Sequence, residues 1–225
     1  MEICCVSDLH GYYPDVGYGD LLIISGDLTA RDTPFEYGQF AAWMDRQKYK
    51  KKILIAGNHD NFFEKRGFED IKDSYSTLDI DYLCDSGTEF EGLKIWGSPW
   101  TPWFHGVNPK CKAFMISESK LKAKWALIPD DTNILITHSP AYGMKDGKSA
   151  NQRLGSTSLL HRQVRQPLFD NCKLHVCGHI HEGYGVFDIR GLQTNLGDKE
   201  ACVYVNASHV NEHYQPVNKP VRIIL

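Results

Sequence analysis

Five short polar motifs in this 225-residue chain each come directly after an apolar run and carry histidine, aspartate or asparagine side chains. Each motif alone is weak evidence, because Asp-x-His and Gly-Asp sequences are common in ordinary turns. Together they supply imidazole, carboxylate and carboxamide groups, with no thiolate among them. The residues concerned are Asp8, His10, Asp27, Asn58, His138, His179 and His181, together with His59 and Asp60 of the third motif.

This set of ligand types predicts a transition-metal site. Imidazole, carboxylate and carboxamide groups suit Mn, Fe, Zn, Ni or Co, whereas calcium prefers oxygen ligands and structural zinc prefers cysteine. Seven donors are too many for one tetrahedral ion. Two ions that share one carboxylate would use them all, and such pairs, about 3.5–4 Å apart, are typical of enzymes that hydrolyse phosphoryl esters.

The apolar runs before the motifs predict the strands that must position these groups. Each run is almost continuously hydrophobic, as in a strand that is covered on both faces. In an open α/β sheet the loops at the carboxyl ends of the strands converge, so all five motifs are expected at one edge. The runs are Ile3–Val6, Leu21–Ile24, Ile53–Ala56, Ile134–Ile136 and Leu174–Cys177.

The segment between the second and third runs predicts a helix that starts with a capping box. Thr33 and Glu36 are the capping pair, Pro34 occupies the first helical position, and Phe40, Trp43 and Met44 form an apolar stripe. We assign the cations Lys48, Lys50, Lys51 and Lys52 to its last turn. Further helices are expected at 118–128 and 157–166, a hairpin at 88–97 that turns at Glu91–Gly92, and strands at 184–189, 201–205 and 221–224.

The composition disfavours several classes of protein. A net charge of −3 disfavours a basic nucleic-acid binder, and no apolar run approaches the roughly 20 residues of a membrane span. Seven cysteines without Cys-x-x-Cys spacing favour buried reduced thiols, and no secretory signal is visible, so we expect a cytoplasmic protein. We expect an α/β fold over a single domain, residues 1–225, with helices flanking two packed mixed sheets.

The polar motifs resemble those of the calcineurin-like metallophosphoesterase superfamily in number, order and spacing. The resemblance is closer to class III cyclic-nucleotide phosphodiesterases and to small metallophosphoesterase-domain (MPPED-type) proteins. It reaches from Asp8 to about Pro220. The segments that carry it are Ile55–His59, Ile95–Trp100, Gly178–Gly185, Asn206–Ser208 and Tyr214–Asn218.

The resemblance implies a four-layer α-β-β-α sandwich and a site for two transition-metal ions. It assigns Asp8, His10, Asp27 and His181 to the first ion, and Asp27, Asn58, His138 and His179 to the second. Asp27 would bridge the two ions, because a carboxylate has two oxygens.

The resemblance also implies catalytic residues. His59 would protonate the leaving oxygen or stabilise charge on the phosphoryl group, and Asp60 would orient its ring. Alternatively, His59 only supports a ligand. The implied reaction is phosphodiester hydrolysis by in-line attack of a hydroxide that bridges the ions.

Three features bear on the substrate, each with two interpretations. Trp100 and Trp103 could stack a nucleobase or pack on the core. The loop 143–155, with Lys145, Lys148 and Arg153, could cover the metals or be a surface loop. Arg31 could face the substrate or merely precede the capped helix.

We expect a small phosphoester as partner, such as a cyclic nucleotide, and neither a membrane nor a stable nucleic-acid partner. A phosphomonoesterase or protein phosphatase could use the same metal core, although the short chain leaves little room for a long peptide groove. A non-catalytic scaffold is a third alternative, which the complete set of ligand positions disfavours.

Overall fold

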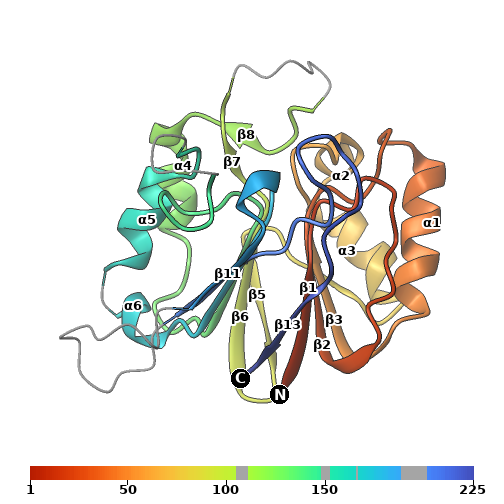
Figure 1. Ribbon diagram of the computed structural model, residues 1–225, viewed down its shortest axis with the longest axis horizontal. Helices are drawn as coiled ribbons and strands as arrows, with labels where there is room; N and C mark the ends of the chain where they lie inside the picture. The colour runs from red at the N-terminus through yellow and green to blue at the C-terminus, as the bar shows by residue number, and fades with distance from the viewer. Residues whose placement is uncertain (105–110, 148–152, 166, 189–201) are drawn as a thin grey trace.

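The computed structural model describes residues 1–104, 111–147, 153–165, 167–188 and 202–225. Two sheets lie face to face, and helices cover the outer face of each one (Figure 1). The arrangement confirms the expected four-layer α-β-β-α sandwich. The expectation of a single domain stays a prediction.

The first sheet contains three of the five strands predicted before the polar motifs. Its order is β13-β1-β2-β3-β4, with β1 to β4 parallel and β13 antiparallel to β1. The bounds are β1 Glu2–Val6, β2 Tyr18–Ser25, β3 Lys48–Ile55, β4 Asp81–Tyr82 and β13 Val221–Ile224.

The second sheet contains the other two of these five strands. Its order is β11-β12-β10-β9-β6-β5; the four central strands are parallel, and the edge strands β11 and β5 are antiparallel to their neighbours. The bounds are β5 Ser86–Phe90, β6 Leu93–Ser98, β9 Ile134–Thr137, β10 Leu174–Cys177, β11 Gly185–Asp188 and β12 Val203–Asn206. A separate parallel pair comprises β7 Thr101–Pro102 and β8 Met115–Ile116.

The helices form the two outer layers, with α1 to α3 over the first sheet and α4 to α6 over the second (Figure 1). None of the helices in the described ranges has both the length and the apolar character needed to cross a bilayer. Their bounds are α1 Pro34–Asp45, α2 Asn61–Arg66, α3 Phe68–Ser76, α4 Glu118–Trp125, α5 Thr157–Gln163, α6 Leu168–Asn171 and the short 3₁₀ helix η1 His181–Gly183.

Alternating side chains of the buried strands supply separate hydrophobic cores. In β1, Ile3 and Cys5 point into the core between the two sheets, whereas Cys4 and Val6 pack on the side of α1 to α3. A third core, with Leu135 of β9, lies under α4 to α6. Because both faces of these strands are buried, their sequences are apolar without alternation.

Helix α1 begins as predicted, but its predicted end is wrong. Thr33 Oγ1 accepts a hydrogen bond from the Glu36 backbone N–H at 3.3 Å, and the Glu36 side chain completes the capping box. The helix ends at Asp45, and the lysines assigned to its last turn belong to β3. There Lys50 pairs with Asp20 and Lys51 with Asp81, each at 2.7 Å, so the charges are satisfied across neighbouring strands.

The remaining predicted elements are present, and their bounds differ by a few residues in all but the strand 221–224. The hairpin of β5 and β6 turns at Glu91 and Gly92, which both have positive φ. The predicted helices at 118–128 and 157–166 end at Trp125 and Gln163. Position 166 lies outside the described residues, as do position 189 of the predicted strand 184–189 and position 201 of the predicted strand 201–205. Helices α2, α3 and α6 and strands β4, β7 and β8 were not predicted.

The close approach of the two sheets at Gly97 provides a test of this packing. A Cβ at Gly97 of β6 would lie 2.5 Å from Leu83 Cβ and 2.8 Å from Ile55 Cγ2. We expect Gly97→Ala to lower the free energy of unfolding by about 1–3 kcal/mol, measured by urea denaturation. The matched control Gly38→Ala lies on the exposed side of α1 with nothing within 4 Å, and should raise it by up to about 1 kcal/mol. Equal stability of Gly97→Ala and the native chain would contradict the packing.

Candidate metal centre

The motif residues come together because their strands end beside one another. Asp8, Asp27 and Asn58 follow β1, β2 and β3 of the first sheet, and His138 and His179 follow β9 and β10 of the second. Backbone hydrogen bonds join the loops: Asp8 N–H donates to Gly26 O, and His10 N–H donates to Asp27 O, both at 3.0 Å. The site therefore lies where the two sheets meet.

The backbone turns sharply at four of the predicted ligands. Asp8, His10, Asp27 and His179 have φ values of 51°, 43°, 55° and 65°. Such left-handed conformations are strained in non-glycine residues and persist only where the surroundings enforce them, often at functional sites. Gly178, just before His179, allows this crowding, since a Cβ there would lie 1.9 Å from Ser7 Oγ.

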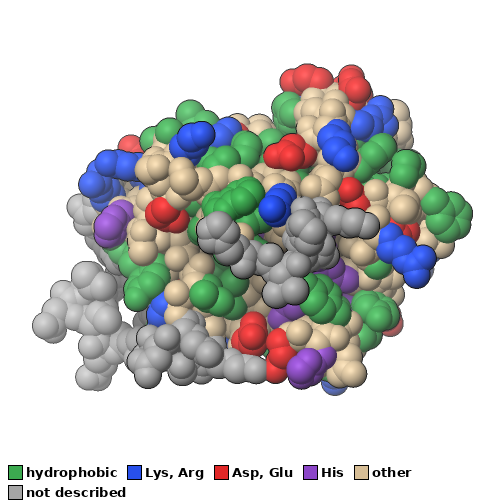
Figure 2. All heavy atoms as spheres, turned by 90° about the horizontal axis from the view of Figure 1, so that it is seen from above, with side chains coloured by type: hydrophobic (Ala, Val, Ile, Leu, Met, Phe, Trp, Pro, Cys, Tyr) green, Lys and Arg blue, Asp and Glu red, His purple; other side chains and the backbone are tan. Residues whose placement is uncertain are grey.

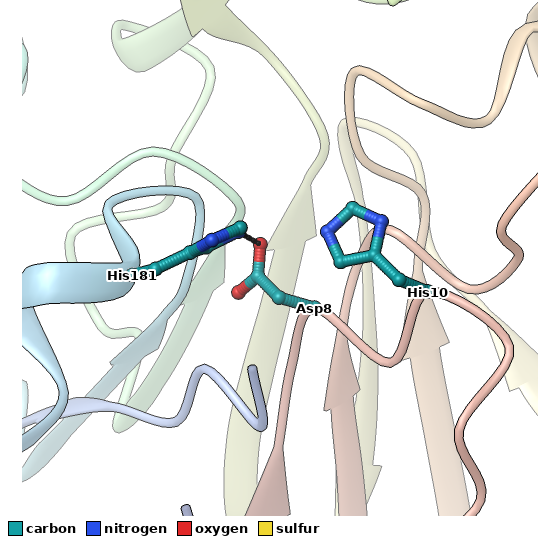
Figure 3. Close-up of side chains that lie close together, drawn as sticks. All are labelled: Asp8, His10 and His181. Atoms are coloured by element: carbon teal, nitrogen blue, oxygen red, sulfur yellow. Dashed lines mark ion pairs between the residues drawn. The ribbon is translucent and has the colours of Figure 1, made fainter. Parts of the chain in front are cut away.

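Asp8, His10 and His181 form the first ligand group, and their ligand atoms lie within 4.8 Å of one another. Figure 3 shows the Asp8 carboxylate between the two rings. The Oδ1 of Asp8 is 3.3 Å from His181 Nε2. His181 Nδ1 is 3.0 Å from the Asn211 carbonyl, which fixes a hydrogen on Nδ1. When this ring is neutral, its Nε2 lone pair therefore faces Asp8 and His10.

His10 supplies direct evidence that the group suits a cation. Its Nε2 is buried and has no hydrogen-bond partner among the described residues, although Asp27 Oδ2 lies 3.7 Å away. Burial lowers the pKa of His10 to about 4, so the ring is neutral at pH 7. A buried, unpartnered lone pair beside carboxylates is what a metal ion would satisfy.

Asp27 and His138 form the second group, together with Asp8. His138 Nδ1 is 2.8 Å from the Ser25 carbonyl, and its Nε2 is 3.3 Å from Asp27 Oδ1 and 3.0 Å from Asn58 Oδ1. The His179 ring lies beside it, with 5.0 Å between ring centroids. Asp27 also belongs to a group with His10 and His59, so its carboxylate contacts both halves of the site, as a bridging ligand would.

The two carboxylates control the charge of the site. Burial alone would raise the pKa of Asp27, but His138 and His59 hold it well below its usual value. His181 does the same for the pKa of Asp8. Burial lowers the pKa of His138, but Asp27 outweighs it and raises this pKa to about 9. Burial and the neighbouring His138 lower the pKa of His179 to about 3.

Asp60 does not contact His59 in the way that we expected. Its oxygens accept hydrogen bonds from the backbone N–H groups of Asp27, Leu28 and Gly57 at 2.7–3.1 Å and from the Tyr37 hydroxyl at 3.0 Å. The carboxylate is fully buried beneath the two loops, and burial and Asp27 raise its pKa to about 7. Asp60 therefore holds the backbone around the bridging position.

Two adjoining hollows, of about 690 and 580 Å³, open over these residues. Figure 2 looks onto this face, where histidine side chains lie among hydrophobic ones. Both hollows include Asn58, His59, Phe104 and Tyr214. The first is also lined by His10, Tyr12, Ala30 and Cys111, and the second by residues that include Trp103, Tyr142, Arg153 and Leu154.

The structure separates the two tryptophans. Trp103 is 45% exposed and lines the second hollow. Trp100 packs against the cores instead: its Nε1–H donates to Asp85 Oδ2 at 2.8 Å, and Lys124 Nζ lies 4.1 Å from its ring centroid. The stacking interpretation thus remains for Trp103, and the packing interpretation holds for Trp100.

The basic residues of the predicted loop and Arg31 also differ from one another. Arg153 lines the second hollow and bonds Asp146 at 3.0 Å, whereas Lys145 accepts a hydrogen bond at its carbonyl from Asn206. Lys148 lies outside the described residues. Arg31 is exposed, and its backbone N–H donates to Glu36 at the start of α1, which fits its interpretation as part of the helix entry.

Sequence reasoning missed four residues around the site. Ser208 Oγ donates to Asp8 Oδ2 at 2.7 Å, and Asn211 positions His181. The Tyr214 ring lies 4.8 Å from that of His10, and Cys111 Sγ lies 3.1 Å from His59 Nδ1. The only signal for Ser208 and Tyr214 was their place in motifs that carried the resemblance.

The comparisons with known proteins agree with this geometry. A family model described as calcineurin-like phosphoesterase matches residues 1–183. Metallophosphoesterase domain-containing protein 1 of Homo sapiens and that of Mus musculus are each 37% identical to this chain over 249 aligned residues, covering 98% of it and 70% of each relative.

Two solved structures share the fold. One is TT1561 of Thermus thermophilus, with a TM-score of 0.58 and 17% identity, covering 91% of this chain and 88% of that one. The other is the phosphopantetheinyl hydrolase PptH of Mycobacterium tuberculosis, with a TM-score of 0.57 and 14% identity, covering 97% and 92%. Identities this low are evidence for the fold alone.

The raised pKa of His138 predicts that metal binding depends on pH. Ligands must be deprotonated to bind a metal, and His138 in the metal-free protein keeps its proton up to about pH 9. The apparent association constant for Mn²⁺ should therefore rise about tenfold per pH unit between pH 7 and pH 9. Calorimetry in two buffers of different ionisation enthalpy should detect the released proton. A constant affinity without proton release at pH 7 would contradict the assignment of His138.

Proposed function

Because the family match spans most of its length, this chain belongs to the calcineurin-like phosphoesterase family, and on that premise we propose that it is a dinuclear-metal phosphodiesterase acting on nucleotide-type esters. Membership itself makes it a metal-dependent phosphoester hydrolase. The preference for diesters and for nucleotides is our proposal.

We assign the ligands to the two metal ions as follows. Asp8, His10, Asp27 and His181 would hold one ion, and Asp27, Asn58, His138 and His179 would hold the other. The unpartnered Nε2 of His10 and the shared position of Asp27 support this division. Bound there, the ions supply Lewis acidity that activates water and neutralises charge on phosphoryl oxygens.

The pair of adjoining hollows is the observation that carries the preference for diesters. The hollows share Asn58 and His59, and each extends away from them along a different wall. A phosphorus atom over Asp27 would then have space for a substituent in each hollow. A monoester has only one substituent and would leave one hollow empty.

His59 is the side chain best placed to act on the reacting group. Its Nε2 lies 3.9 Å from Asp27 Oδ2, and its backbone N–H donates to Asp27 Oδ1 at 2.9 Å, so the ring stands beside the bridging carboxylate. It lines both hollows. From Nε2 it stabilises charge on the phosphoryl group and its leaving oxygen. Asp60 supports this loop through the backbone of Gly57.

The second hollow has the chemistry to accept a nucleotide. Trp103, Phe104 and Tyr142 present aromatic surface, and Arg153 presents a cation. A base can stack on an aromatic side chain whatever its identity, and a guanidinium can bind a phosphate or pair with a ring face.

A substrate panel tests the proposed reaction. With Mn, Fe, Zn or Ni supplied, we expect faster turnover of bis(p-nitrophenyl) phosphate than of p-nitrophenyl phosphate, and hydrolysis of 2′,3′- or 3′,5′-cyclic nucleotides. Asp27→Ala should lower the rate at least about 1,000-fold, because it removes the bridging carboxylate. A faster rate on the monoester would identify a phosphomonoesterase. No hydrolysis and no metal uptake would identify a scaffold.

The two tryptophans provide a matched test of nucleotide binding. Trp103→Ala should raise KM for a nucleotide diester by about 5- to 150-fold, the equivalent of losing about 1–3 kcal/mol of stacking. Trp100→Phe removes the indole N–H at a packed position and should leave KM unchanged. If the two variants had equal KM values, the second hollow would not be part of the nucleotide site.

A further inference from the structure

The two nitrogens of the His59 ring have different neighbours. Its Nε2 faces Asp27, and its Nδ1 lies 3.1 Å from Cys111 Sγ. Asp60, the expected partner, makes its bonds elsewhere, as described above. Among the described residues, Cys111 is therefore the side chain that contacts the far nitrogen of this ring.

Backbone contacts show that Cys111 is held in this place. Its carbonyl accepts a hydrogen bond from Asn58 Nδ2 at 3.3 Å, and the N–H of Ala113 donates to Asn58 O at 3.1 Å. The N–H of Phe114 donates to Glu64 Oε1 of α2 at 2.8 Å. The segment 111–114 is thus tied to the loop that carries Asn58 and His59, and the thiol is aimed by this docking.

The two neighbours of the ring determine where its hydrogen lies. The Asp27 carboxylate, 3.9 Å from Nε2, is too far for a hydrogen bond, but its negative charge favours a hydrogen on that nitrogen of the neutral ring. Nδ1 then carries a lone pair, and only a donor can satisfy it. A thiol can donate its hydrogen to Nδ1, whereas a carboxylate there would favour the opposite tautomer.

We propose that Cys111 is a positioning residue for His59: its thiol donates to Nδ1 and keeps the ring hydrogen on Nε2, the nitrogen that faces the reacting phosphoester. This inference rests on the proposed function, in which Nε2 donates a hydrogen bond to the leaving oxygen. It assigns Cys111, which also lines the first hollow, a role that acts through His59.

Nuclear magnetic resonance of the metal-free protein tests the tautomer without any activity. Ring ¹⁵N shifts of His59, assigned by comparison with His59→Gln, should show the hydrogen on Nε2 in the native chain and in Cys111→Ser, whose hydroxyl can also donate. Cys111→Ala should lose this preference. A hydrogen on Nδ1 in the native chain, or identical ring shifts in native and Cys111→Ala protein, would overturn the proposal.

Kinetics provide the second readout. On a diester with a poor leaving group, Cys111→Ala should lower kcat about tenfold with KM unchanged, while bis(p-nitrophenyl) phosphate, whose leaving group needs little help, should change less than about twofold. Cys111→Ser should recover most of the loss. Cys84→Ala, which removes another partly buried thiol outside the site, should have no effect.

The double variant separates positioning from a merely structural role. In the His59→Ala background, Cys111→Ala should cause no further loss. A further loss there, or an equal fall on both substrates with a fall in bound metal, would overturn the proposal. If the native protein hydrolyses no ester, the proposed function fails, and the ring shifts still decide the role of Cys111.

Discussion

The burial of the Asp27 carboxylate is the constraint on which the site depends. The residue is 1% exposed, and a buried charge is strongly destabilising unless its surroundings satisfy it. Its oxygens lie beside the rings of His10, His59 and His138, which come from loops of both sheets. Satisfying one carboxylate therefore brings together the ends of β1, β2, β3 and β9. The sheets supply the stability that holds this arrangement.

A second buried carboxylate, that of Asp60, lies beneath Asp27 and supports its loop. Asp60 accepts the backbone N–H groups of Asp27 and Leu28, so it fixes the left-handed turn at Asp27 from below. The two negative charges repel, which contributes to the raised pKa of Asp60. Cations at the upper carboxylate would offset this repulsion. The same bonds explain why Asp60 matters to His59 only through the backbone.

The sequence predicted the site residues that directly follow a buried strand. Asp8, Asp27, Asn58, His138 and His179 each come directly after a buried apolar run, and both the strands and their polar ends were predicted. Lys48 to Lys52 were misassigned because the first half of β3 is polar and continues past the buried part of the sheet. Cys111 could not have been found, since its contact with His59 joins positions 52 residues apart through a loop without periodicity.

The C-terminal segment shows why a match to the family model does not describe the whole site. The match ends at residue 183, yet Ser208 donates to Asp8, and the carbonyl of Asn211 orients His181. Asn206 Nδ2 binds the carbonyl of Ile180 at 2.8 Å and so holds the turn between His179 and His181. A metal ligand is effective only when its free lone pair is aimed, and hydrogen bonds to its other atoms do the aiming. Residues 206–214 therefore support the proposed site of the first ion, although we assign none of them as a ligand.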